Sequence, residues 1–282
     1  MLQRKLDLAR AENFTFKRLL TERERRMEEM RQSTSWRGTA LMRGLGDWLR
    51  TKRWTGLRPI AARRRRASFV VDNGEYQQWL RSYSLIDSAL RARLAARVDS
   101  LAARPLISVI MPNYNVDLKF LRAAIDSVRQ QIYPFWQLCI SDDASTLEGV
   151  RALLERAAAQ DDRIRVTLRA NNGHISVNSN GALDLARGDY VALMDADDLL
   201  PQDALFWVAH EIALNPDVDL IFSDEDKIDE TGRRFDPYFK TAWNPALMLA
   251  QNAFCHLGVY RRSLVEQVGR FTDVTVGLAT LI

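Results

Sequence analysis

Short apolar runs alternate with amphipathic segments through the middle of the chain. The runs are rich in strand-forming side chains such as valine and isoleucine, and the segments between them repeat apolar side chains at helical spacing. The pattern predicts strands over residues 107–111, 136–140, 164–168 and 190–194, and helices over residues 118–131, 147–159 and 175–186. This alternation predicts an α/β fold with a mostly parallel sheet flanked by helices.

The chain before Pro105 has a different pattern. Residues 1–33 place apolar side chains close to a heptad stripe, and residues 76–103 carry an apolar stripe that ends at Pro105. Both segments predict helices, the first as either a peripheral helix or a coiled coil. We therefore expect a helical, basic N-terminal extension over residues 1–103 and an α/β domain over residues 104–282.

Charge separates the two ends of the chain. Residues 1–66 hold 19 Lys and Arg against 7 Asp and Glu, and residues 67–282 hold 21 against 29. A basic segment can contact a polyanion such as anionic lipid. Tryptophans among its arginines are typical of a membrane interface, although a solvated basic face fits the same pattern. We expect peripheral membrane contact through residues 1–66 and no nucleic-acid partner.

The cysteines and the N-terminus bear on the cellular compartment. Cys139 and Cys255 stand apart in apolar runs, which indicates neither a disulfide framework nor a zinc site. Residues 1–30 mix charged and apolar side chains and lack the apolar core of a signal peptide. The uncharged stretch over residues 241–260 is too polar to span a membrane. We expect a cytoplasmic protein, peripheral at most on the inner face of the cell membrane.

Polar side chains follow three of the predicted strands. They are Pro112, Asn113, Tyr114 and Asn115 after the first strand, Ser141, Asp142, Asp143 and Ser145 after the second, and Asp195, Asp197 and Asp198 after the fourth. Singly they could be turn formers or helix caps. Ligands of open α/β sheets bind at the carboxyl ends of the strands, where clustered carboxylates repel one another unless a cation is present. The pattern favours Mg²⁺ or Mn²⁺ with a diphosphate ligand.

Several other nucleotide-binding classes do not fit. The chain has no Gly-rich loop that ends in Gly-Lys-Ser/Thr and no complete dinucleotide fingerprint. A nucleotidyltransferase is expected to carry a basic, Gly-rich loop after the first strand, where this chain has residues 112–115. A phosphorelay receiver would need its acidic pair at the same place. These classes are therefore set aside.

Five motifs occur in an order that resembles a known family. They are Ser108-Val-Ile-Met-Pro-Asn-Tyr-Asn115, Cys139-Ile-Ser-Asp-Asp-Ala-Ser-Thr146, Gly173-His-Ile-Ser176, Asp195-Ala-Asp-Asp198 and Ser223-Asp-Glu-Asp-Lys227. Over residues 105–271 the sequence resembles the family 2 glycosyltransferases with the GT-A fold, in particular rhamnosyltransferase-like enzymes that build bacterial surface polysaccharides.

The resemblance implies a donor site and a reaction. Asp142 or Asp143 would hold the nucleotide base of a nucleoside-diphosphate sugar, in a pocket that also contains residues 112–115. Asp195 and Asp197 would contact the ribose and a metal-bound diphosphate, with Mg²⁺ or Mn²⁺ as the ion. The sugar would pass with inversion to a saccharide acceptor, free or lipid-linked.

The catalytic base is not identified by the resemblance. Family members continue past the position of Phe271 into a segment that holds the base, whereas this sequence ends at Ile282. We therefore expect an apparently truncated C-terminus, with Asp224 and Glu225 as weak candidates for the base. The alternative is an inactive domain that acts as a binding or interaction protein. His256 could approach the metal or the acceptor, but a buried core histidine is the expectation.

Overall fold

A computed structural model describes residues 74–241 and 254–272, apart from the side chains of Glu75 and Tyr83. The chain separates into two compact units, Met1–Ser84 and Leu85–Ile282. The predictions for residues 1–66 lie outside the described residues. No helix in the described ranges is long and apolar enough to cross a membrane.

The predicted helix over residues 76–103 is interrupted. The first unit contains α3 (Gly74–Trp79) and the π-helix η1 (Leu80–Ser84), and the second unit begins with α4 (Ser88–Val98). Asp87 caps α4, because its carboxylate accepts a hydrogen bond of 2.6 Å from the Leu90 N–H. The sequence therefore starts a new helix where its apolar stripe continues.

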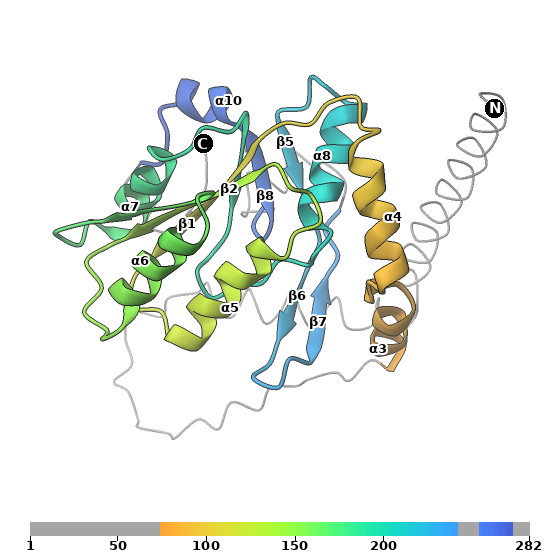
Figure 1. Cartoon of the computed structure of the whole chain (residues 1–282), viewed down its shortest axis with the longest axis horizontal. Helices are drawn as coiled ribbons and strands as arrows, with labels where there is room; N and C mark the ends of the chain where they lie inside the picture. The colour runs from red at the N-terminus through yellow and green to blue at the C-terminus, as the bar shows by residue number, and fades with distance from the viewer. Residues whose placement is uncertain (1–73, 242–253, 273–282) are drawn as a thin grey trace, which may run out of the picture. The chain divides into compact units, whose positions relative to one another are not determined.

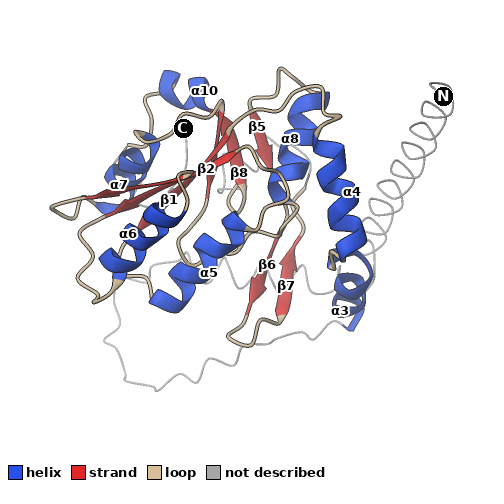
Figure 2. Ribbon diagram, viewed as in Figure 1, coloured by secondary structure: helices blue, strands red, loops and turns tan. Residues whose placement is uncertain are grey.

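A mostly parallel sheet forms the centre of the second unit, as predicted (Figure 1). Among the described residues its order is β3-β2-β1-β4-β8-β5, in which the first four strands are parallel and β8 is antiparallel to both neighbours. The bounds are β1 Ile107–Asn113, β2 Trp136–Asp142, β3 Ile164–Leu168, β4 Tyr190–Leu193, β5 Leu220–Phe222 and β8 Gly258–Arg261. A separate antiparallel hairpin consists of β6 Glu225–Ile228 and β7 Arg234–Tyr238 (Figure 2).

Helices connect the strands as crossovers. Their bounds are α5 Leu118–Arg129, α6 Val150–Gln160, α7 His174–Leu183, α8 Ala204–Leu214 and α10 Arg262–Gln267. The chain moves outward from β1 to β3 through α5 and α6 and returns to β4 through α7. Right-handed crossovers therefore put α7 on the face opposite α5 and α6.

The core explains why β1 and β2 read as continuous apolar runs. Every residue of β2, and all but one of β1, is buried, as expected for parallel strands covered on both faces. On the face covered by α7 and α10, one core cluster joins four strands and both helices: Ile110, Cys139, Ala182, Leu183, Val191, Tyr260 and Val265. This packing aligns the carboxyl ends of β1, β2 and β4 on one edge of the sheet.

Candidate functional site

The ends of β1 and β2 are joined by side chains of the predicted donor site. Asn113 and Asp142 are register partners, and the Asn113 Nδ2 donates to Asp142 Oδ1 over 2.6 Å. Asn115 adopts a left-handed backbone with φ of 52°, and its Oδ1 accepts from the N–H groups of Thr146 (2.8 Å) and Leu147 (2.9 Å). The two polar loops after these strands therefore form one connected network.

The adjacent acids of the second loop have separate partners. Asp142 accepts from the Ser145 hydroxyl over 2.6 Å. Asp143, 1% exposed, accepts from the Gly173 N–H with both oxygens at 3.0 Å, and its Oδ1 lies 2.8 Å from the Arg169 Nε. Each carboxylate is thus compensated by donors from this chain, which explains how two acids in sequence can be buried here.

Two buried amide oxygens in this region lack a donor. The Oδ1 atoms of Asn113 and Asn178 have no hydrogen-bond partner among the described residues, although both side chains are almost fully buried. The Asn178 Nδ2 donates to the Asn113 backbone carbonyl over 3.1 Å, so the two amides are neighbours. An unpaired buried acceptor costs about 1–3 kcal/mol, which a ligand that donates a hydrogen bond would recover.

The loop after β4 carries the third acidic group. The Met194 N–H donates to the Ile110 carbonyl over 3.1 Å, so Asp195 leaves β4 beside β1. The Asp195 side chain is exposed, but crowding by neighbouring atoms limits the hydration of its carboxylate, and together with the nearby Asp198 carboxylate this raises its pKa. The potential ligand atoms of Asp195, Asp198 and His256 lie within 4.8 Å of one another, and Asp197 is exposed on the same loop.

His256 is not a core histidine, and that expectation is wrong. Its side chain is 43% exposed, and its Nδ1 lies 2.8 Å from Asp198 Oδ2. This hydrogen bond raises the pKa of the imidazole to about 8. The other interpretation of His256, that it could approach the metal or the acceptor, is compatible with its position beside the acidic loop. The structure thus brings His256 into contact with Asp198 of the predicted acidic group, because β8 pairs with β4 and places a distant segment beside the acidic loop.

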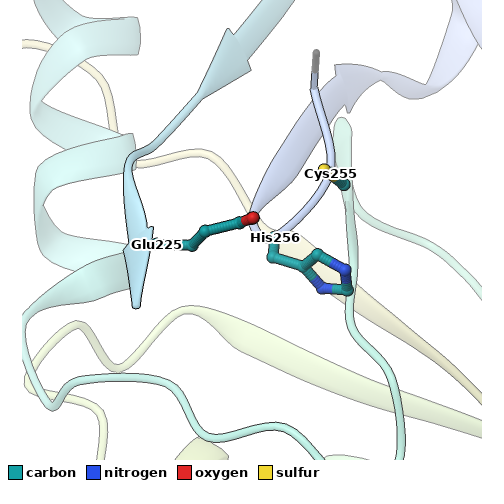
Figure 3. Close-up of side chains that lie close together, drawn as sticks. All are labelled: Glu225, Cys255 and His256. Atoms are coloured by element: carbon teal, nitrogen blue, oxygen red, sulfur yellow. The ribbon is translucent and has the colours of Figure 1, made fainter. Parts of the chain in front are cut away.

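The weak base candidates lie just after β5, with Asp224 in the connecting loop and Glu225 at the start of β6. The Asp224 carboxylate accepts from the Lys240 N–H over 2.6 Å, and Glu225 Oε2 is 3.2 Å from the Lys240 Nζ. Glu225 also approaches Cys255 and His256, with ligand atoms within 4.8 Å of one another (Figure 3). Both acids therefore have partners within the chain.

The donor set of the β4 loop suits a hard divalent ion. Carboxylate oxygens with one imidazole nitrogen fit Mn²⁺ or Mg²⁺, which leave positions open for phosphate oxygens. The group of Glu225, Cys255 and His256 fits an ion poorly, because the Lys240 ammonium already lies beside its carboxylate.

Fold and site together define the class: an α/β domain with an acidic group of side chains at one edge of a mostly parallel sheet. The chain belongs to glycosyl transferase family 2, because residues 108–269, more than half of its length, match that family. This confirms the family and the type of fold indicated by the motifs.

Individual relatives share only part of their length with this chain. It is 46% identical over 198 residues to the uncharacterized protein y4gI of Sinorhizobium fredii, which covers 70% of this chain and 22% of that protein. It is 36% identical over 172 residues to the O-antigen biosynthesis protein RfbC of Myxococcus xanthus, covering 61% and 14%. A solved mannosyltransferase of Pyrobaculum calidifontis, in complex with GDP-Man and Mn²⁺, shares 21% identity with a TM-score of 0.48, covering 67% and 57%.

Proposed function

We propose that this domain transfers a sugar from a nucleoside diphosphate to a saccharide acceptor, free or lipid-linked, during surface polysaccharide synthesis. The observation that carries the proposal is the convergence of three polar loops on one sheet edge in a family 2 chain. The name of the relative from Myxococcus xanthus, an O-antigen biosynthesis protein, supports the class of product.

The ends of β1 and β2 would hold the nucleoside. Asp142 or Asp143 would hold the base, and their hydrogen bonds with Asn113 and with the Gly173 N–H keep the surrounding loops in place. Tyr114, half exposed, presents a ring against which a base can stack, next to Pro112 and Asn115. The proposed nucleoside pocket is thus built from residues 112–115, 142 and 143.

The loop after β4 would hold the ribose, the metal and the diphosphate. We assign these contacts to Asp195 and Asp197, with the Asp198–His256 pair beside them. When bound, Mg²⁺ or Mn²⁺ neutralises the charge that develops on the leaving diphosphate. The hydrogen bond between His256 Nδ1 and Asp198 would orient the imidazole ring beside these carboxylates.

Transfer with inversion also needs a base at the acceptor hydroxyl. Asp224 and Glu225 remain the candidates among the described residues, and their contacts with Lys240 fix the positions of both carboxylates. A domain that binds donor but transfers no sugar with any acceptor would favour the binding-protein alternative.

Variants of the acidic loop test the proposal. Calorimetric titration of UDP, GDP and dTDP with Mn²⁺ should show binding to the wild type that weakens at least about tenfold in Asp195→Asn and in Asp197→Ala. The exposed Asp162 serves as the matched control, and Asp162→Asn should bind as the wild type does. Unchanged affinity in both site variants would refute the assignment of the metal and diphosphate.

A further inference from the structure

Lys240 is a buried lysine whose charge is fully surrounded. The residue is 4% exposed and follows β7. Its ammonium lies 3.2 Å from Glu225 Oε2 and donates to the backbone carbonyls of Cys255 and, over 3.3 Å, His256. A buried ammonium is tolerated only with such partners, because an unpaired one would cost several kcal/mol. Lys240 therefore ties the β6–β7 hairpin to the segment just before β8.

The segment just before β8 has a backbone conformation that requires stabilising contacts. His256 has a left-handed backbone with φ of 46°, a conformation that costs a residue with a side chain about 1 kcal/mol or more. Beyond it, the Leu257 N–H donates to the Ser223 hydroxyl over 3.0 Å. Lys240 holds the carbonyl before His256 as well as that of His256 itself, so it constrains the backbone from which the imidazole projects.

The ammonium also lies beside a group of possible metal ligands, Glu225, Cys255 and His256. Figure 3 shows these three side chains converging from β6 and from the segment before β8. A cation bound there would meet the Lys240 charge at close range and be repelled. The Lys240 ammonium therefore takes the place of a metal cation beside Glu225.

We infer that Lys240 is a positioning residue of the donor site, which holds the His256 backbone so that the imidazole meets Asp198 beside Asp195. The effect of Lys240 on donor binding rests on the proposed function. The effect of Lys240 on the position of the imidazole rests only on the contacts described above. The hydrogen bonds from the Lys240 ammonium to the carbonyls of Cys255 and His256 give this effect a direct route through the His256 backbone.

The geometry can be tested without nucleotide or metal. In protein labelled with ¹⁵N-histidine, the ring of His256 is identified by the signal lost in His256→Asn. We expect Lys240→Met to shift or broaden that signal at constant pH while the signals of His174 and His210 stay in place. Lys227→Met is the matched control, because Lys227 pairs with Asp236 on the same hairpin and its side chain is 64% exposed.

A second variant keeps the inference testable if the Lys240→Met protein does not fold. Glu225→Gln keeps the shape of the side chain and removes the charge that holds the ammonium, so the His256 signal should also broaden as its backbone loosens, in addition to the lower imidazole pKa that loss of the nearby Glu225 charge gives by itself. An unmoved His256 signal in a folded Lys240→Met or Glu225→Gln protein would overturn the inference.

A double-mutant cycle tests the consequence for the donor site. With UDP and Mn²⁺, Lys240→Met should weaken binding about tenfold, the size seen when outer-shell partners of a site are removed. The same change in a His256→Asn background should add no further loss, because Lys240 acts through that ring. Additive losses would contradict the inference. A wild type that binds no nucleotide would refute the proposed function and leave the imidazole measurement to decide the geometry.

Discussion

At the scale of single residues, the site is stabilised by assigning each acid its own partner. Asp142 pairs with Asn113 and Ser145, whereas Asp143 pairs with Arg169 and the Gly173 N–H. If the two acids shared one donor, one buried carboxylate would lack a hydrogen-bond or ion-pair partner, and proteins rarely tolerate this. Asp143 consequently connects the end of β2 to the start of α7.

Removal of the Asp143 charge should therefore be costly. We expect Asp143→Asn to lower the free energy of unfolding by about 3 kcal/mol, because Arg169 would lose its buried partner. Urea denaturation measures the loss. Asp99→Asn is the control, since the Asp99–Arg104 pair is exposed and should contribute less than about 1 kcal/mol. Equal losses in the two variants would contradict the assignment.

Asp161 gives a prediction for pH. Hydrogen bonds from Arg163 lower the pKa of Asp161 in the folded protein, so this acid stabilises the fold above its unfolded pKa of about 3.9. The stability difference between the wild type and Asp161→Asn should be constant near neutral pH and shrink as pH falls below about 4. Because Arg163 is 41% exposed, we expect a small effect, below about 1 kcal/mol. A difference that grows on acidification would be inconsistent with this pairing.

At the scale of elements, the strands and helices between residues 107 and 194 were predictable because their periodicity is strong. The ends of the strands were less predictable from the sequence. Strands β1 and β2 continue to Asn113 and Asp142, because their parallel pairing extends past the apolar runs. The break before α4 was missed, because Asp87 looks like an ordinary surface acid until its cap is seen. Local patterns indicate elements well and their interruptions poorly.

The approach of β4 to β1 depends on Gly188. A Cβ at this position would lie 2.4 Å from the Leu106 carbonyl oxygen and 2.9 Å from the Ser108 nitrogen, both backbone atoms that cannot move aside. Gly188→Ala should reduce the free energy of unfolding by about 1–3 kcal/mol in chemical denaturation. Gly74→Ala, where a Cβ would meet nothing within 4 Å, is the control. A Gly188→Ala protein as stable as the wild type would rule out this close contact.

At the scale of the whole molecule, the site joins residues far apart in sequence. The acidic motifs alone pointed to Asp195 and Asp197, whereas His256 reaches Asp198 across a separation of 58 residues. No local pattern near His256 signals this contact, which arises only when β8 inserts between β4 and β5. The matched part of the chain spans 22% and 14% of the two relatives described above.

Thermal unfolding of the wild-type chain with UDP, GDP and dTDP, in Mn²⁺ and in chelator, tests the central claim most directly. A ligand that prefers the folded state stabilises it by about 2.7 kcal/mol at a hundred times its dissociation constant. We predict that at least one nucleotide raises the midpoint by several degrees with Mn²⁺ and that the chelator abolishes the rise. A folded protein whose midpoint moves with no nucleotide, or moves equally in chelator, would contradict a metal-dependent donor site.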